Sequence, residues 1–505
     1  MISVFIDSPR TELLVTLLLP ILLHVTGCQS PVAPSRVTAP RADDVALVSR
    51  SVADAPSFET DLCPIIQTAI LGEGLTLPQR SGVPVEESEP QPAEPAIETP
   101  SAEADHDELP RLVSLAVSGN PRLQSLLQQA NAASARTQYV HRLPDPTFGA
   151  NIFGHPIETA AGSQRGNLTF MQMIPWMDRL NAQQQQACFE AMALRQEYAA
   201  ERLRVIAEVR RRYYKLYVLT RQIETVEASQ QLLQTLINIA TARVATGNAT
   251  QGDVLLGTLE YSRLEEQLVS LRQRVRSTVA GINQQISRPS ATPIAVPKRL
   301  ELEKPSWSHE FLVQTAWERQ PLIAAAQLRA NATRWGVDVA DLRRRPDFQL
   351  GVSWFFMDDN RPATPVVDVG RDAWSVGATV SIPLDHTKYD AIRDEALWEH
   401  ASSASALRDI RQEFDARLLD LLEQATAAAK TSELYQETII PQSKQTLAAD
   451  QESLANGNVE FDRVIQDFRN LLTLDFGYHQ TVGDLAVAIA GIQQAAGVEL
   501  RPAFP

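Results

Sequence analysis

Two stretches of sequence decide the fold: residues 245–255, ATGNATQGDVL, and residues 455–465, ANGNVEFDRVI, which lie 210 positions apart. Glycine and asparagine tolerate a left-handed backbone, so Gly247-Asn248 and Gly457-Asn458 predict tight turns. Helical patterns flank both turns. The two stretches therefore predict the tips of two helical hairpins that arose by internal duplication.

The duplication extends outward from these tips. Six short matches occur in the same order in both halves of the chain, and their offset grows slowly from 200 to 210 residues. Four of them are Asn120-Pro121 with Gln320-Pro321, Ala130-Asn131-Ala132 with Ala330-Asn331-Ala332, Pro146-x-Phe148 with Pro346-x-Phe348, and Ile174-Pro175 with Ile382-Pro383. The other two are Gly247-Asn248 with Gly457-Asn458 and Gly281-Ile282 with Gly491-Ile492. The chain therefore holds two copies of one unit of about 200 residues.

Each copy predicts the same order of elements. A helix over 109–142 (308–343 in the second copy) precedes a strand, a polar loop over 154–166 (357–372) and a returning strand. In residues 374–382, WSVGATVSI, apolar side chains alternate with small polar ones, which is typical of a strand with lipid on one side and water on the other. A long helix follows over 177–245 (386–455), and a shorter one returns over 253–286 (460–496) with a coiled-coil seam.

The helix lengths agree with one another. The long helix has about 69 residues, or ~100 Å at 1.5 Å per residue, and the two shorter helices have about 34 residues each. Laid end to end, the shorter helices match the long one. We therefore expect half-helices stacked head to tail against each long helix, with the proline-rich segment 287–307 joining the copies at mid-height.

The amino-terminal region predicts export and lipid anchoring. Residues 13–25 are nearly all apolar but too short to span a bilayer, as in the apolar part of an export signal. The run ends in Val25-Thr26-Gly27-Cys28, which resembles a bacterial lipobox and predicts that Cys28 is acylated, for example by palmitate. The flank around Asp7, Arg10 and Glu12 has no net positive charge, which departs from the usual export signal and puts the given start in question. Gln29 in place of Asp implies sorting to the outer membrane.

Composition separates a tether from a folded part. The 505 residues carry a net charge of −15, but residues 81–108 contribute nine acidic side chains and no Lys or Arg, which leaves 109–505 with only −3. Residues 29–108 hold 11 of the 31 prolines and predict a disordered, acidic tether. The acidic balance argues against nucleic-acid binding. Three cysteines make no disulfide scaffold, and the eight histidines form no pair with metal-ligand spacing.

The strand count predicts the assembly. Four strands in one chain cannot close a barrel, and open strand edges are not tolerated in lipid. Two chains would give eight strands, whose interior fills with side chains, whereas three chains give twelve and leave a water-filled pore. The fold class we expect is therefore mainly α with a small β part: a homotrimer with a twelve-stranded transmembrane β-barrel above a helical tube.

Across about residues 109–497 the chain resembles the TolC-type outer-membrane efflux channels. The duplication, the strand ends Ile174-Pro175-Trp176 and Ile382-Pro383-Leu384, and both tip segments carry this resemblance. It implies a passive exit duct, without enzymatic activity or cofactors, that works with an inner-membrane pump and a periplasmic adaptor (membrane fusion protein). The lipobox and the methionine-rich strand are similar to the lipoprotein and heavy-metal branches, so metal cations or drugs are the substrates implied.

The resemblance also suggests site residues. Acidic residues just past the tip glycine ring the closed periplasmic mouth in that family. Asp253 matches that spacing, but in the second copy Arg463 takes its place, and Asp462 and Asp467 are the candidates. They lie ~140° apart around a helix, so both cannot point squarely into a pore. The alternative is an ordinary solvated helix face. Gly247, Asn248, Gly457 and Asn458 are candidates for adaptor docking, or serve the turns alone.

Other residue groups favour structural interpretations. Met171, Met173 and Met177 suggest soft-metal contacts, but packing is favoured. Packing in the tube wall is also expected for Tyr213, Tyr214 and Tyr217. We expect Cys188 to be buried or inert and Cys63 to be a lone thiol.

These inferences divide the chain into a signal peptide (1–27), a tether (28–108), a first repeat (109–287), a linker (288–307), a second repeat (308–497) and a tail (498–505). Two other classes remain as alternatives. A periplasmic coiled-coil adaptor would have one hairpin and many short strands, and a structural lipoprotein without a pore would lack the strand pairs. No catalytic constellation is present, so an enzyme is not expected.

Overall fold

A computed structural model describes residues 108–160, 162–300, 302, 304–359 and 369–498. By its internal contacts the chain divides into two compact units, residues 1–54 and 55–505, and the first lies wholly outside the described residues. The predicted signal peptide, Cys28, Cys63 and the tether up to residue 107 also lie outside them. Among the described helices, none combines the length and the apolar character that a membrane crossing requires.

Each repeat begins with two short helices rather than the single helix predicted. Helix α4 (Glu108–Gly119) precedes α5 (Pro121–Tyr139), and α8 (His309–Arg319) precedes α9 (Pro321–Leu342). The predictions of one helix over 109–142 and one over 308–343 were wrong. A proline disfavours helical backbone in the residue before it, and it fits well at the first position of a new helix. Asn120 and Gln320 are accordingly extended and cap the second helix.

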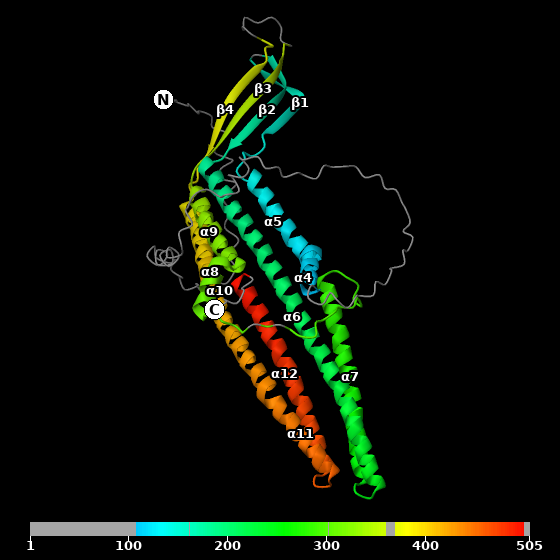
Figure 1. Ribbon diagram of the computed structural model, residues 1–505. Helices are drawn as coiled ribbons and strands as arrows, with labels where there is room; N and C mark the ends of the chain where they lie inside the picture. The colour runs from blue at the N-terminus through cyan, green and yellow to red at the C-terminus, as the bar shows by residue number, and fades with distance from the viewer. Residues whose placement is uncertain (1–107, 161, 301, 303, 360–368, 499–505) are drawn as a thin grey trace, which may run out of the picture. The chain divides into compact units, whose positions relative to one another are not determined.

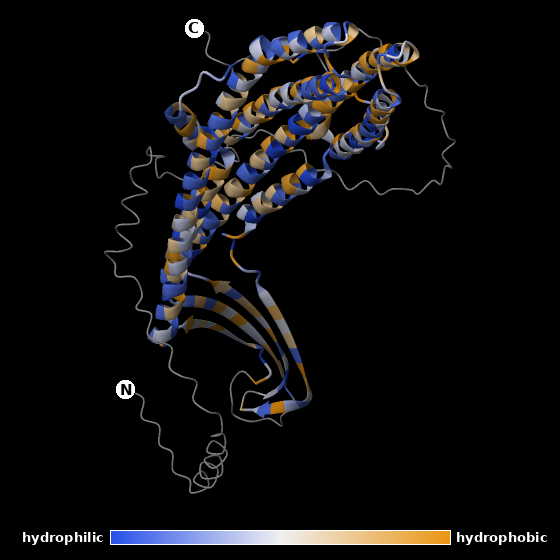
Figure 2. Cartoon of the chain, turned by 90° about the horizontal axis from the view of Figure 1, so that it is seen from below, coloured by the Kyte–Doolittle hydropathy of each residue, from blue (hydrophilic) through white to orange (hydrophobic). Residues whose placement is uncertain are grey.

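The strands of both repeats form one antiparallel sheet in the order β1-β2-β3-β4 (Figure 1). Its members are β1 (Thr147–Thr159), β2 (Gly162–Ile174), β3 (Asp347–Asp358) and β4 (Ala373–Ser381). The polar loop predicted over 154–166 is instead mostly strand, because β1 and β2 stay paired up to Thr159 and Gly162 after a register shift. Hydropathy alternates along the strands, as Figure 2 shows.

The long helices are close to those predicted. Helix α6 (Met177–Ala245) is continuous for 69 residues, and α7 (Gln251–Gln285) returns beside it. The second long helix consists of α10 (His386–Leu434), a π-helical turn η1 (Tyr435–Ile439) and α11 (Ile440–Ala455), and α12 (Phe461–Ala496) returns along it. The sheet lies at one end of these helices and both hairpin turns at the other (Figure 1).

The predicted stacking of half-helices is confirmed at two joints. The side-chain oxygen of Asn120 accepts from the Arg122 N–H at 2.9 Å, while its amide donates to the Gln285 carbonyl at the end of α7, at 3.3 Å. At the second joint, the amide of Gln320 donates to the carbonyls of Gln494 and Ala495 at the end of α12, at 2.8 and 2.9 Å. One side chain therefore caps the start of one half-helix and the end of the next.

Three apolar cores hold the helices together. One joins α4, α5 and α7 to α6 near the first joint and contains Leu112, Val209 and Ile282. Another joins α8, α9, α10 and α12, with Leu312 and Leu418 at its centre. The third, at the tips, combines both hairpins through buried residues of α6, α7, α11 and α12. The two hairpins are thus packed against each other down to their turns.

Candidate functional site at the helix tips

Both tips close in the same way. Gly247 and Gly457 adopt positive φ values of 75° and 81°. The N–H of Asn248 donates to the Arg243 carbonyl, and the N–H of Asn458 donates to the Ser453 carbonyl, each at 2.9 Å. A side chain at either glycine would be strained by this left-handed backbone. The structure therefore gives the Gly-Asn pairs a turn-forming role.

The first residues after the turns differ. In the first hairpin the carboxylate of Asp253 accepts from the Thr250 N–H at 2.9 Å, which is the return arm of a capping box at the start of α7. In the second hairpin the equivalent position holds Arg463, whose guanidinium instead lies 3.3 Å from the Asp450 carboxylate on α11. Asp253, predicted as a gate candidate, is therefore engaged in capping.

Asp462 and Asp467 occupy different environments, as their angular separation on the helix predicts. Asp462 is exposed and accepts a hydrogen bond from Gln466 at 2.7 Å, one turn further along α12. Asp467 is only 7% exposed and is directed toward Asp450 and Arg463 within its own hairpin. Of the two predicted residues, only Asp462 presents its carboxylate on the surface of the protomer.

Burial dominates the electrostatics of Asp467. Removal from water and a hydrogen bond with the Asp450 carboxyl raise the pKa of Asp467 above its ordinary value, although Arg463 opposes the shift. When two carboxyl groups share a buried site, ionising both costs free energy because the two negative charges repel each other. Asp450 was not identified from the sequence, and it is the residue that gives Asp467 its unusual environment.

An ion pair connects the two hairpins. Glu260 on α7 is 6% exposed and accepts from Arg469 on α12 at 2.6 Å and from Arg263 at 3.0 Å. Burial raises the pKa of Glu260, but the two arginines outweigh that effect and hold it below its ordinary value. Glu260 lies 13 residues after Gly247 and Arg469 lies 12 after Gly457. Opposite charges at matched distances from the two turns were the sequence signal that could have found this pair.

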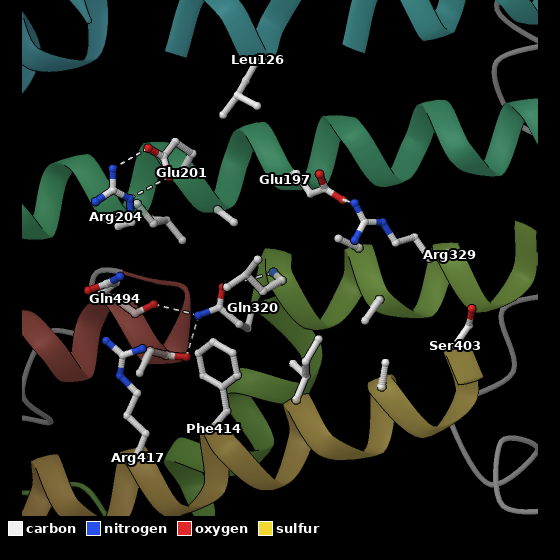
Figure 3. Close-up of a pocket in the computed structure, with 18 of the residues that line it drawn as sticks. Leu126, Glu197, Glu201, Arg204, Gln320, Arg329, Ser403, Phe414, Arg417 and Gln494 are labelled. Carbon is white, nitrogen blue, oxygen red and sulfur yellow. Dashed lines mark hydrogen bonds and ion pairs between the residues drawn. The ribbon is translucent and has the colours of Figure 1, made fainter. Parts of the chain in front are cut away.

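Nearer the sheet, a cavity of about 770 Å³ lies between α6, α9, α10 and α12 (Figure 3). Both glutamates that line it are ion-paired: Glu197 with Arg329, and Glu201 with Arg122 and Arg204. Five arginines line the cavity in all, and burial lowers the pKa of one of them, Arg211. The cavity is thus a positively charged space built from both repeats.

The remaining candidate residues are placed as follows. Tyr213 and Tyr217 are buried, as expected for packing, whereas Met171, Met173 and Met177 are 40–53% exposed. In the described part of the chain, no three His, Cys, Asp or Glu side chains are close enough to hold a metal ion. Cys188 is buried, as expected, and forms a disulfide bond.

These features define a class: an internally duplicated, mostly helical chain whose paired helical hairpins carry one small antiparallel sheet. The family model for outer membrane efflux proteins matches residues 112–286 and 312–474, and the chain belongs to that family.

Solved structures of low sequence identity share the fold. The outer membrane protein VceC of Vibrio cholerae is 18% identical, with a TM-score of 0.66 over 77% of this chain and 96% of its own. The CmeC outer membrane channel of Campylobacter jejuni is 14% identical, with a TM-score of 0.64 over 83% and 94%. The MtrE outer membrane channel of Neisseria gonorrhoeae, solved in an open state, is 15% identical, with a TM-score of 0.64 over 81% and 97%. The comparison with curated proteins yields no match.

Proposed function

We propose that three copies of this chain form a passive exit duct through the outer membrane, which serves a tripartite efflux system. One observation carries the proposal: the strands of both repeats form a single sheet, in which β1 and β4 each have only one neighbour among the described strands. An unpaired strand edge is costly in lipid. Joining β1 of one protomer to β4 of the next would remove every edge and give a barrel of twelve strands.

The sheet has the surface that such a barrel requires. Its exposed apolar side chains include Trp354, Trp374, Val376 and Val380, each at least 44% exposed in the protomer. The intervening β4 positions are Ser375, Gly377 and Thr379. This alternation suits lipid outside and water inside. Below the barrel, the ~100 Å helices would form the wall of a periplasmic tube.

The other parts of the chain have roles in this assembly. Residues 1–27 act as the export signal, and acylated Cys28 anchors the chain to the outer membrane. Residues 28–108 form the tether that connects this anchor to the repeats. The segment 288–307 links the first repeat (109–287) to the second (308–497), and the tail 498–505 follows. The turns at Gly247-Asn248 and Gly457-Asn458 are docking points for a periplasmic adaptor, which connects the duct to an inner-membrane pump. Heavy-metal cations or drugs are the proposed substrates.

The tips provide the gate in this proposal. Exposed Asp462 faces the mouth, so that a trimer brings three carboxylates together and attracts cations. Asp467 contributes to the gate from inside the second hairpin, beside Asp450. Asp253 stabilises the tip of the first hairpin by capping helix α7. The Glu260–Arg469 pair holds the two hairpins together in the closed arrangement.

The proposed duct is tested with a matched pair of strand variants. Val376→Arg places a charge on the lipid-facing side of β4, which costs about 2–4 kcal/mol near the bilayer midplane, whereas Ser375→Arg points into water. We expect native mass spectrometry and planar-bilayer recordings to find conducting trimers for the wild type and Ser375→Arg, and a loss of membrane-inserted trimer for Val376→Arg. Equal behaviour of the two variants, or a non-conducting monomer in the wild type, would refute the barrel.

The gate is tested separately by Asp462→Ala, with Glu266→Gln on the exposed face of α7 as the control. Removal of three mouth carboxylates should reduce cation preference and weaken block by multivalent cations, while the control should leave both unchanged. If Asp462→Ala keeps the wild-type selectivity, another group lines the mouth.

A further inference from the structure

The proposed duct does not explain the arginine-lined cavity of Figure 3. Its volume of about 770 Å³ lies within the range of about 300–1,000 Å³ that small-molecule sites occupy. Five arginines and two glutamates line it, so its walls carry three more positive than negative charges. The arginines come from both repeats: Arg122, Arg204 and Arg211 from the first, and Arg329 and Arg417 from the second. The cavity is therefore a cationic space at the contact between the repeats.

The two glutamates compensate three of these arginines. The carboxylate of Glu201 lies 2.7 Å from the guanidinium of Arg122 and 2.6 Å from that of Arg204. The carboxylate of Glu197 pairs with Arg329. The other two arginines therefore have no carboxylate of their own within the cavity lining.

Those two arginines, Arg211 and Arg417, are poorly compensated. The carboxylate nearest to Arg211 is that of Glu208, 3.5 Å away and outside the cavity lining, and Glu208 also accepts from Arg212 at 2.7 Å. The Nε atom of Arg211 is buried and makes no hydrogen bond in the described chain. Arg417 makes no ion pair or hydrogen bond with any residue that the structure describes. Two guanidinium groups thus line the cavity with little neutralising charge.

These cations are close enough to affect one another. Burial lowers the pKa of Arg211, and Glu208 opposes this shift. The charges of Arg417 and Arg204 lower the pKa of Arg211 further, because like charges repel. Figure 3 shows the side chains of Arg204, on α6, and Arg417, on α10, on either side of Gln494 at the end of α12. The side-chain oxygen of Gln494 is buried and lacks a hydrogen-bond partner in the described chain, as expected at a site for a polar ligand.

An anion is the ligand that would remove this repulsion. Guanidinium groups bind phosphate and carboxylate oxygens through paired N–H donors. A phosphate monoester carries a charge of about −1.5 to −2 near pH 7. A phosphate group therefore offsets more of the excess positive charge than a single carboxylate does.

Part of the cavity lining is apolar. Phe414 on α10 is 4% exposed, and Ala325 and Ala326 on α9 are 3% and 8% exposed. Leu203 and Ile410 also line the cavity. Apolar walls with a few polar groups are typical of sites for organic ligands. A phosphate that carries an apolar group therefore fits this lining better than inorganic phosphate does.

The cavity lies well away from the sheet. Helix α6 begins at Met177, and the cavity residues Glu197 and Arg211 follow 20 and 34 residues later. They are thus ~30–50 Å along the helix at 1.5 Å per residue. This distance favours a soluble phosphate over the headgroup of a lipid bound at the apolar sheet.

We propose that the cavity binds a small soluble organic phosphate. Its phosphate group lies among Arg204, Arg211 and Arg417, and its organic part contacts the apolar wall at Phe414. The ligand in this position contacts α6 of the first repeat and α10 of the second. Because it binds only where both repeats are packed together, it stabilises the folded chain and the contact between the repeats.

Calorimetric titration of the full-length protein, in a nonionic detergent at low ionic strength, tests the ligand class. We expect one molecule of phenyl phosphate to bind per chain. Inorganic phosphate lacks the apolar contact and benzoate carries a single charge, so each should bind about tenfold more weakly. Equal affinity for either of them, or no binding of phenyl phosphate, would overturn the proposal.

Variants at Arg417 test the location of the site. Arg417→Gln should weaken the binding of phenyl phosphate about tenfold. Arg417→Lys keeps the charge without the paired donors, so its affinity should be intermediate. Arg408→Gln is the matched control, because Arg408 is exposed on the same helix and is not part of the cavity lining. If Arg417→Gln binds as the wild type does, phenyl phosphate binds elsewhere and the proposal is wrong.

Thermal unfolding of the same variants separates binding from folding and does not depend on conduction. Phenyl phosphate should raise the apparent unfolding temperature of the wild type and Arg408→Gln, and should raise that of Arg417→Gln less. Without ligand, Arg417→Gln should unfold no earlier than the wild type, because the change removes a charge that repels Arg211. Earlier unfolding of Arg417→Gln would show that Arg417 serves the fold and would overturn its assignment to a ligand.

Discussion

In the first repeat the long helix α6 is uninterrupted over 69 residues, whereas in the second the corresponding stretch contains a π-helical turn at Tyr435–Ile439. Pro441 comes two residues after this turn and lacks the N–H that a regular helix would use there. The Tyr435 hydroxyl packs 2.8 Å from where a side chain on Gly477 would begin, so α12 leaves room for the distorted turn. The second hairpin also contains the buried Asp467. The π-helical turn and the buried carboxyl pair of Asp467 and Asp450 therefore both belong to the second of two related hairpins.

The tips extend this comparison. The first is capped by Asp253, while the second has Arg463 at that position and an acid pair behind it. The following predictions compare matched positions in the two hairpins.

The largest difference is expected at the two helix joints. Gln320 is 3% exposed and makes the shorter hydrogen bonds, so Gln320→Ala removes the side-chain donor from the buried carbonyl of Ala495 and the partly buried carbonyl of Gln494. We expect a loss of about 2–3 kcal/mol in the free energy of unfolding. Asn120→Ala removes a helix cap and should cost about 1 kcal/mol. Denaturant unfolding of the detergent-solubilised protein measures both, and equal losses would show that the joints are equivalent.

The ion pair between the hairpins should rank next. Glu260→Gln removes the charge that Arg469 and Arg263 contact and is expected to cost about 1–2 kcal/mol. Amide hydrogen exchange should increase in the tip halves of both α7 and α12, because the pair connects them. The exchanged pair Glu260→Arg with Arg469→Glu should recover part of the loss. If exchange increases in α7 alone, the pair does not couple the hairpins.

The helix caps should show a smaller effect. Asp253→Ala removes the carboxylate that accepts from the Thr250 N–H and should destabilise the first tip by about 1 kcal/mol. Asp462→Ala is the matched change in the second tip. Its carboxylate bonds only Gln466 in the same helix, so a loss of about 0.3 kcal/mol is expected. Amide hydrogen exchange over residues 246–256 and 456–466 measures the two effects separately. A larger increase in exchange for Asp462→Ala than for Asp253→Ala would contradict the assignment of Asp253 as a helix cap.

The smallest effect is the pH dependence that Asp467 contributes to the second tip. The pKa of Asp467 is raised in the folded protein, so its protonated form favours folding. That stabilisation is complete below the unfolded pKa of about 3.9 and is lost as the pH rises through the raised folded value. Exchange near residue 467 should therefore be slower in acid, after correction for intrinsic rates. Asp467→Asn should be protected at every pH, and a wild-type tip without pH dependence would show that Asp467 is not coupled to folding.

Sequence patterns located most of the fold. The duplicated Gly-Asn turns and the 3.6-residue periodicity gave the bounds of α6, α7 and α12 to within two residues. The prediction of a single helix through Asn120-Pro121 failed because the apolar periodicity continues across a break that the backbone of proline imposes. The prediction of a loop over 154–166 was wrong because β1 and β2 pair through polar residues there. The composition of a segment alone does not reveal such pairing between strands.

The candidate site shows the same division. Local chemistry determined the turns at Gly247 and Gly457, since a left-handed backbone is accessible to few residue types. The sequence placed Asp462 and Asp467 on different sides of one helix, but only the packing of α11 against α12 decided that Asp467 is buried beside Asp450. Only the packing of the hairpins against each other could bring Glu260 to Arg469, because their contact joins residues 209 positions apart. The sequence by itself determined where helices turn, while the tertiary structure decided which charges lose their water and which partners replace it.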